Sequence, residues 1–272
     1  MRWTFRNIVL AAGGLLLLYL IGMMSLYIFI NPIVFRAERT GHYKTPVSQR
    51  IREERIPLPG EQELCAYFFA ARAPHKGVVL FLHGVRGNLD RYAAQCLQFT
   101  QRGYSVLMPD GRGFGKSEGR IGESSLMEDV LACSDWLNKR YREDSIVVYA
   151  MDFMAPAASY ANAIWPCRLL VLDNPVYSLR SWIRRRYPAF VLPYELKYDF
   201  NTYEYLPNCL SPVFILRPRY RAACTPEEAT RLQQMLPDPG AFLQLEEAQG
   251  ESPYELDSYR RILDQLLTTA SR

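Results

Sequence analysis

An uncharged run of 23 residues, from Ile8 to Ile30, constrains the fold of this chain more than any other feature of its sequence. About 20 consecutive apolar residues are enough for a helix to cross the hydrocarbon layer of a bilayer. A secretory signal peptide has a shorter apolar core and a small-residue cleavage site, whereas this run leads into Asn31 and Pro32. The sequence therefore predicts an uncleaved signal anchor at residues 1–35, with a transmembrane helix over about residues 8–30.

The charges on the two sides of this helix are nearly balanced. Arg2 and Arg6 precede the apolar run, and Arg36, Arg39 and Lys44 follow it. Positive charges therefore give little guidance on orientation, but a short tail before a long apolar run usually stays in the cytoplasm. We expect a single-pass membrane protein whose folded domain lies on the non-cytoplasmic side.

The rest of the chain divides into two parts. Residues 36–57 are rich in charges and turn formers and are expected to form a stalk that leads to a first edge strand. Residues 58–272 are long enough for one α/β domain, since folds of this class run to roughly 200–250 residues.

Short apolar runs alternate with amphipathic segments along this domain. The runs that predict buried strands are residues 77–82, 104–108, 145–150, 169–172 and 213–216. The segments that predict helices are residues 91–102, 126–141, 155–164, 226–236 and 258–267. This alternation favours a doubly wound, mostly parallel sheet with helices on both faces. Ligands of such sheets bind at the carboxyl ends of the strands, so the chemistry is expected in the loops that follow them.

The basic residues do not form a nucleic-acid-binding pattern. The net charge of +4 is modest, and no basic run is interleaved with stacking aromatic residues, so we expect no nucleic-acid partner. The main basic cluster is Arg184, Arg185 and Arg186 beside Tyr187. It suits either a solvated helix face or contact with anionic lipid.

The six cysteines form no C-x-x-C pair and match no zinc module. The sequence therefore predicts no metal site and implies no cofactor. The cysteines suit buried free thiols, or one disulfide if the domain lies in an oxidising compartment.

Three stretches carry a family resemblance. They are FLHGVRGN at Phe81–Asn88, GYSVLMPDGRGFGKSEG at Gly103–Gly119 and SIVVYAMDFMAPAASYAN at Ser145–Asn162. Together they resemble the α/β-hydrolase superfamily, in its membrane-anchored, serine-hydrolase-like branch related to esterases and S33-type peptidases. The resemblance covers roughly residues 50–268 and implies the α/β-hydrolase fold with a small cap over about residues 180–212. It also implies a set of structural motif residues, namely His83, Gly84, Asp110, Arg112, Gly113 and Gly115.

The nucleophile of this family lies in G-x-S-x-G, on a sharp strand-to-helix turn that small residues allow to close. Ala150–Met154 reads AMDFM here, so Asp152 takes the serine position. We expect the methionine at the second glycine position to crowd the turn. The backbone N–H groups of Val85 and Phe153 match the oxyanion-hole positions of the family.

The family's catalytic histidine belongs to the loop before the last helix, which here is Leu245–Tyr259. That segment contains no histidine, and the whole chain has only His42, His75 and His83. His42 falls in the predicted stalk, and His75 precedes the first buried strand. His83 lies on the oxyanion side, where the resemblance implies a structural role. A base needs hydrogen-bond reach of its proton, so the sequence predicts no imidazole base.

The acid of the triad is replaced as well. The chain reads RPRYRAACTP from Arg217, which puts Arg221 at the position of the family's acid. A cation there cannot accept the N–H of an imidazole. Asp173, after the preceding strand, is either a relocated acid or a strand-end residue that caps the next turn.

These losses predict a membrane-tethered, catalytically inactive α/β-hydrolase-like protein that acts by binding a lipid, small-molecule or protein ligand. The aromatic-rich segment Ser181–Pro212 suits either packing over the sheet or a contact surface for a ligand or the bilayer. The alternative is an esterase- or peptidase-like hydrolase with an altered active site. It would use Asp152 as nucleophile and His83 or a carboxylate such as Glu251 as base.

Overall fold

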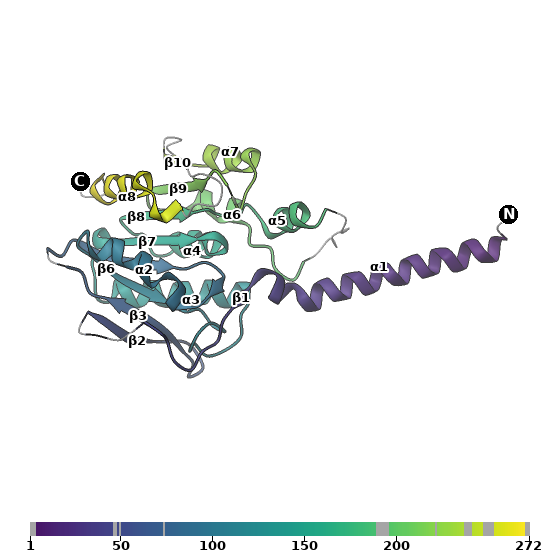
Figure 1. Cartoon of the computed structure of the whole chain (residues 1–272), viewed down its shortest axis with the longest axis horizontal. Helices are drawn as coiled ribbons and strands as arrows, with labels where there is room; N and C mark the ends of the chain where they lie inside the picture. The colour runs from purple at the N-terminus through teal and green to yellow at the C-terminus, as the bar shows by residue number, and fades with distance from the viewer. Residues whose placement is uncertain are drawn as a thin grey trace.

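An eight-stranded sheet lies at the centre of the domain (Figure 1). The computed structural model describes residues 4–45, 48, 50–72, 74–188, 196–220, 222–236, 241–246 and 253–269. The strands of the sheet are β2 (Ile51–Pro57), β3 (Glu63–Phe69), β4 (Gly77–Leu82), β6 (Tyr104–Pro109), β7 (Ile146–Met151), β8 (Leu169–Asp173), β9 (Val213–Pro218) and β10 (Phe242–Leu245). They lie in the order β10-β9-β8-β7-β4-β6-β3-β2. All neighbours are parallel except β2 with β3 and β3 with β6.

Apolar and β-branched residues build the central strands. β4 reads GVVLFL and β7 reads IVVYAM, and every residue of the two strands except Gly77 is buried. Strands that are covered on both faces need such continuous apolar runs. Successive side chains then point to opposite faces, so that Val78 and Leu80 join one core while Val79 and Phe81 join the other.

Helices cover both faces of the sheet. Helices α2 (Leu89–Thr100) and α8 (Asp257–Thr269) pack on the face of Val79 and Phe81. The opposite face is covered by α3 (Glu123–Asn138), α4 (Ala155–Asn162), α5 (Leu179–Arg186), α6 (Thr202–Tyr205) and α7 (Pro226–Gln234). The five strands and five helices predicted from the sequence pattern are all present, with ends displaced by up to three residues. This arrangement is the doubly wound α/β sheet that the pattern predicts.

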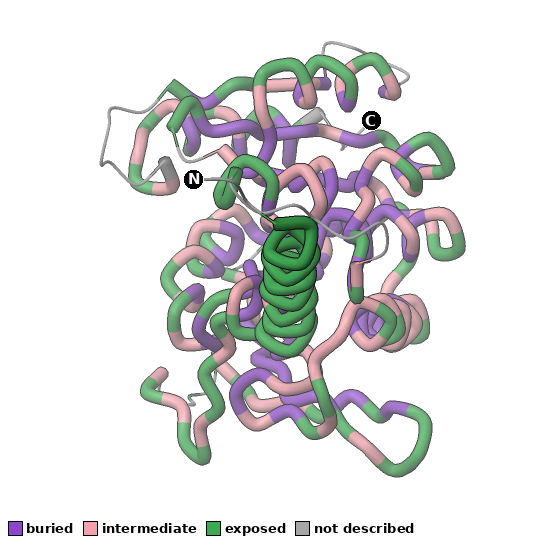
Figure 2. Tube along the Cα trace, turned by 90° about the vertical axis from the view of Figure 1, so that its right-hand side faces the viewer, coloured by how far each residue is buried: buried purple, intermediate pink, exposed green. Residues whose placement is uncertain are grey.

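Helix α1 (Phe5–Val34) projects from the domain as an exposed rod (Figures 1 and 2). Within the described residues, its segment Phe5–Ser25 is the one helix long and apolar enough to cross a membrane. The last turns of α1 are different, because Ile30 and Val34 are buried against the domain. The hydroxyl of Tyr198 also donates to Asn31 Oδ1 over 2.8 Å. The helix is therefore docked at its base and free along its apolar length.

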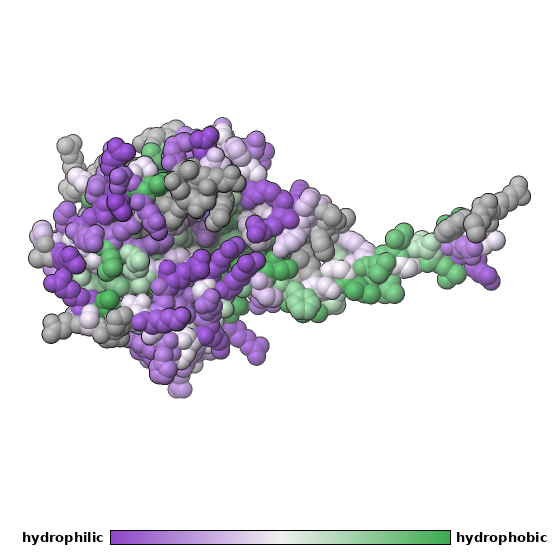
Figure 3. All heavy atoms as spheres, viewed as in Figure 1, coloured by the Kyte–Doolittle hydropathy of each residue, from purple (hydrophilic) through white to green (hydrophobic). Residues whose placement is uncertain are grey.

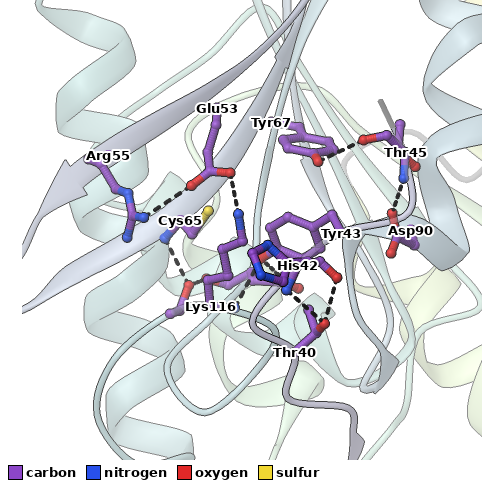
Figure 4. Close-up of polar contacts among 12 residues, drawn as sticks. Thr40, His42, Tyr43, Thr45, Glu53, Arg55, Cys65, Tyr67, Asp90 and Lys116 are labelled. Atoms are coloured by element: carbon purple, nitrogen blue, oxygen red, sulfur yellow. Dashed lines mark hydrogen bonds and ion pairs between the residues drawn. The ribbon is translucent and has the colours of Figure 1, made fainter. Parts of the chain in front are cut away.

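The segment expected to be a stalk, residues 36–57, lies against the domain instead. Arg36–Ala37 forms β1 and pairs with β5 (Arg86–Gly87), and residues 51–57 form the edge strand β2. Figure 4 shows Thr40, His42, Tyr43 and Thr45 of the segment between them beside residues of the domain. There the backbone N–H groups of Lys44 and Thr45 both donate to Asp90, each over 2.7 Å. The charges that suggest a solvated stalk are therefore in part hydrogen-bonding partners of this attachment.

Tyr43 is the centre of this attachment. Its hydroxyl donates to Asp110 Oδ2 over 2.5 Å and accepts from the backbone N–H of Lys116 over 3.1 Å. The Lys116 ammonium lies 4.8 Å from the centre of the Tyr43 ring and 2.7 Å from Glu53 Oε2. The phenol thus ties the segment after α1 to the buried loop that follows β6.

We predict that Tyr43→Phe loosens this attachment. The change leaves partly buried polar groups without a partner, so the free energy of unfolding should fall by about 1–3 kcal/mol. Urea unfolding of the full chain in detergent micelles measures the loss, and limited proteolysis after Lys44 should become faster. Tyr160→Phe is the matched control, because Tyr160 has a ring contact with Tyr205 and no recorded hydrogen bond of its hydroxyl among the described residues. Equal losses in the two variants would contradict the role of Tyr43.

Candidate functional site

Asp152 lies at the turn between β7 and α4, where parallel sheets bind their ligands. Its φ of 50° is in the left-handed region, which residues other than glycine rarely adopt. A sharp, strained turn at this place is the geometry that presents a nucleophile in this fold. The turn has this geometry with a methionine at position 154, whose side chain is buried in the core.

Gly84 makes room for the Asp152 carboxylate. A Cβ atom at position 84 would lie 2.7 Å from Asp152 Oδ2, closer than such contacts allow. Gly84, one of the motif residues of the sequence analysis, is therefore required here for steric reasons. Val85 and Phe153, whose backbone N–H groups match the oxyanion positions, both line the same cleft as Asp152.

Asn174 holds the carboxylate from the other side. Its Nδ2 donates to Asp152 Oδ1 over 2.8 Å, and its Oδ1 accepts from the backbone N–H of Ala223 over 2.7 Å. Burial raises the pKa of Asp152 to about 6, against the opposing effects of the Asn174 hydrogen bond and the Arg86 charge. The sequence interpretation missed Asn174. The available signal was an Asn directly after a buried strand, where it has a φ of 55° that Asn tolerates better than most residues.

Asp173, the relocated acid of the sequence analysis, is fully buried among tyrosines. The hydroxyl of Tyr149 donates to Asp173 Oδ2 over 2.6 Å and lies 2.8 Å from the hydroxyl of Tyr259. Burial raises the pKa of Asp173 to about 7, the Tyr149 hydrogen bond lowers it, and the nearby charge of Asp152 raises it again. Asp173 therefore contacts phenols of the core on the α2 and α8 side of the sheet.

The loop expected to carry a histidine is described only in part. Residues 247–252, including Glu251, lie outside the described residues. Tyr254 and Glu255 of the same loop line the cleft. Burial and the charges of Asp173 and Asp152 raise the pKa of Tyr254 well above its usual value. This phenol stays protonated at neutral pH and interacts with Asp173, so it does not serve as a base.

The three histidines lie elsewhere. His83 is buried, with Nδ1 at 2.8 Å from the carbonyl oxygen of Gly84 and Nε2 at 2.9 Å from Asp110 Oδ1. His75 is exposed just before β4, at the amino end of the strand and thus at the opposite edge of the sheet. His42 belongs to the attached segment after α1 and is exposed (Figure 4). Because the sequence has no other histidine, no imidazole is available to activate a water at Asp152.

The remaining motif residues hold the loop that follows β6. Asp110 is fully buried and contacts both His83 and Tyr43. Arg112 binds Asp129 through its backbone N–H over 2.8 Å and its Nε over 2.7 Å. Gly113 and Gly115 have positive φ angles of 86° and 45°. A Cβ at Gly115 would lie 1.9 Å from Asp110 Oδ2, so this position requires glycine.

Arg221, at the position of the family's acid, lies outside the described residues. Arg217, which begins the same segment, is buried and places its Nη2 3.4 Å from the carbonyl oxygen of Cys224. All six cysteines are free, and five of them are buried. Within the part of the chain that the structure describes, no group of three or more His, Cys, Asp or Glu side chains is placed to hold a metal ion.

Asp152 faces an open cleft of about 970 Å³. Its described lining comes from the base of α1, from β5, α2 and α5, and from the loops after β7, β8 and β9. The volume is at the upper end of the range for small-molecule sites. The cleft is thus large enough for an organic ligand and has the altered catalytic residue in its wall.

Comparison with known proteins agrees with this geometry. Residues 73–152 match the family model of serine aminopeptidase S33. An uncharacterized protein of Mycobacterium tuberculosis is 28% identical over 140 residues, which are 51% of this chain and 50% of that protein. Lysophosphatidylserine lipase ABHD12 of Xenopus tropicalis is 27% identical over 128 residues, covering 42% and 33% of the two chains. An uncharacterized membrane protein of Saccharomyces cerevisiae is 26% identical over 201 residues, 69% of each chain.

The match thus spans about half the length of the mycobacterial relative. Among solved structures, the esterase Pf2001 of Pyrococcus furiosus superposes with a TM-score of 0.67 at 19% identity, over 86% of this chain and 98% of that one. At such low identity, the structural similarity shows a shared fold but does not show a shared activity. With this sheet order the chain has the α/β-hydrolase fold, and its segment from before β4 to the turn at Asp152 is similar to the S33 family.

Proposed function

We propose that this protein is tethered to a membrane by α1 and binds a ligand in the cleft beside Asp152 without hydrolysing it. The observation that carries the proposal is that the residue at the nucleophile turn faces a large cleft that no imidazole reaches. Hydrolysis through a serine or an aspartyl ester needs a base that activates water. His83, the nearest histidine by sequence, has both ring nitrogens engaged by Gly84 and Asp110.

The tether is supported by the exposed apolar length of α1 and by the likeness to a yeast membrane protein. The short tail before α1 favours a domain on the non-cytoplasmic side. The cap region, of which residues 180–188 and 196–212 are described, contributes Trp182 and Arg186 to the cleft. A ligand in the cleft would therefore contact the cap as well as the turn at Asp152.

One observation favours a second candidate, a hydrolase that uses Asp152 as nucleophile. The strained turn with a φ of 50° is retained, and the carboxylate beside it lines the cleft. The structural similarity to esterases is consistent with this reading. A base would then have to come from a group other than histidine.

Hydrolysis assays with the full-length protein in detergent micelles separate the two candidates. We expect p-nitrophenyl esters of two to eight carbons and aminoacyl p-nitroanilides to be cleaved at the same background rate by the wild type and by Asp152→Ala. Asp144→Ala is the control, since Asp144 is exposed and pairs with Arg142 far from the cleft. Turnover that is present in the wild type and in Asp144→Ala but absent in Asp152→Ala would overturn the proposal in favour of the hydrolase.

Asp152→Asn is predicted to stabilise the protein at neutral pH, with a gain that is complete above the folded-state pKa of about 6. Burial raises that pKa from 3.8 to about 6, so ionisation at neutral pH opposes folding. Asn removes the charge, keeps an acceptor for Asn174 and tolerates a positive φ. We expect a gain of about 1–3 kcal/mol at pH 7.5, the lower part of that range reflecting the partial exposure of the site. The gain should shrink as the pH falls from 6 towards 4, because the folded state is then protonated and the unfolded state approaches its own pKa of 3.8.

Urea unfolding at pH 7.5 and pH 4.5 measures this difference. A gain of equal size at both pH values would mean that ionisation of Asp152 is not its source. A loss of stability at pH 7.5 would contradict the prediction outright.

A further inference from the structure

The walls of the cleft carry an excess of positive charge. Four arginines line it, namely Arg86 of β5, Arg91 of α2, and Arg185 and Arg186 of α5. Among the described lining residues they face two carboxylates, Asp152 and Glu255. Guanidinium groups that converge from three separate segments on one concave site suit the binding of an anion.

These arginines differ in how far they are already engaged. Arg185 contacts the carbonyl oxygen of Ala223 and lies 3.7 Å from Glu228 Oε2. Arg86 and Arg91 are exposed. Burial raises the pKa of the neighbouring Tyr92 to about 12, and the Arg91 charge and hydrogen bond and the Arg86 charge oppose this rise. Arg86 also acts on Asp152 by charge. Arg86 and Arg91 therefore remain able to bind a further anionic group.

Apolar side chains also line the cleft, and one of them belongs to the base of α1. Val34, the last residue of α1, lines the cleft together with Trp182 and Phe153. The Phe153 and Trp182 rings pack edge to face with their centres 5.4 Å apart. Arg186 lies 5.5 Å from the centre of the Trp182 ring. One cleft thus combines cationic and apolar side chains.

The position of the cleft favours a ligand from the bilayer. Because α1 is docked at Ile30 and Val34, and the segment after it is attached through Tyr43, the cleft is held next to the point where α1 leaves the domain. Figure 3 shows hydrophilic side chains of the domain close to this junction, beside the apolar helix. A cleft of about 970 Å³ is also far larger than an inorganic anion requires.

We infer that the cleft binds a membrane lipid with an anionic phosphate head group, held by Arg86 and Arg91 with Arg186 beside them, while its acyl chain lies along Val34 and Trp182. This inference rests on the proposed binding function and names its ligand. The phosphate oxygens accept from the guanidinium groups, and the chain replaces water at the apolar side chains. No bond of the lipid is made or broken.

Binding of a fluorescent phosphatidic acid to the full-length protein in nonionic detergent micelles tests the inference by fluorescence anisotropy. Phosphatidylcholine with the same chains is the zwitterionic reference. We expect the double variant Arg86→Gln, Arg91→Gln to bind phosphatidic acid about tenfold or more weakly, since charge-assisted hydrogen bonds are lost. Arg184→Gln is the matched control, because Arg184 is exposed on α5 but does not line the cleft. Thermal unfolding of each variant checks that its fold is intact.

Each outcome decides one point. Equal binding of the two lipids, or equal affinity in the double variant and in Arg184→Gln, would overturn the inference. Competition by glycerol 3-phosphate or inorganic phosphate as strong as that by unlabelled phosphatidic acid would also overturn it, since a soluble anion would then be the ligand. Mass spectrometry of the bound lipid tests the proposed function separately. A cleaved lipid would overturn binding without hydrolysis, whereas an intact but arginine-independent lipid would overturn only the head-group assignment.

Discussion

The turn between β7 and α4 holds a carboxylate where it is costly to keep one. Asp152 has a left-handed backbone and a partly desolvated side chain. Gly84 provides the space for it, and Asn174 provides a hydrogen bond that partly offsets the loss of water. Gly84 follows β4 and Asn174 follows β8, so the turn at Asp152 depends on the relative positions of β4, β7 and β8. Strain of this kind persists only where the surrounding structure determines it, which is why it is common at functional sites.

Two acidic groups at adjacent strand ends extend this constraint into the core. Met151 of β7 pairs with Asp173 of β8. Asp152, the residue after Met151, therefore lies near Asp173 at the carboxyl ends of these two strands. Their charges raise the pKa of Tyr254, while Tyr149 and Tyr259 bind Asp173 from within the core. The hydrogen-bonding partner of Asp173 is therefore a phenol and not an imidazole. A phenol can satisfy the buried carboxyl by donating a hydrogen bond, but it cannot take up a proton at neutral pH.

Much of the fold follows from local pattern. Continuous apolar runs mark β4, β6, β7 and β8 because both faces of these strands are covered, and the amphipathic helices follow the same logic. The attachment of residues 36–57 could not be predicted in this way. It depends on Tyr43 reaching Asp110 across 67 positions of sequence, and on Asp90 accepting from Lys44 and Thr45. Contacts between distant segments produce no periodic pattern in the sequence, so they cannot be predicted from it.

The site shows the same division between local and distant information. The position of Asp152 could be predicted from its place after a buried strand, and the missing imidazole from a count of histidines. The space for its carboxylate could not, because it depends on Gly84, which lies 68 positions earlier in the sequence. The cationic lining of the cleft could not be predicted either, since Arg86, Arg91 and Arg186 come from three segments that only the folded sheet brings together.

The charges in the cleft also limit where an anion can lie. Asp152 repels an anion at the turn when it is ionised, and its raised pKa shows that its own surroundings already disfavour the charge. An anionic group in the cleft therefore gains most at Arg86 and Arg91, which are exposed and line it. Any anion that does come close to Asp152 must raise the pKa of that carboxyl, and protonation of Asp152 must strengthen binding of the anion by the same free energy. The residue that replaces the nucleophile thus sets how deeply a charged ligand can enter.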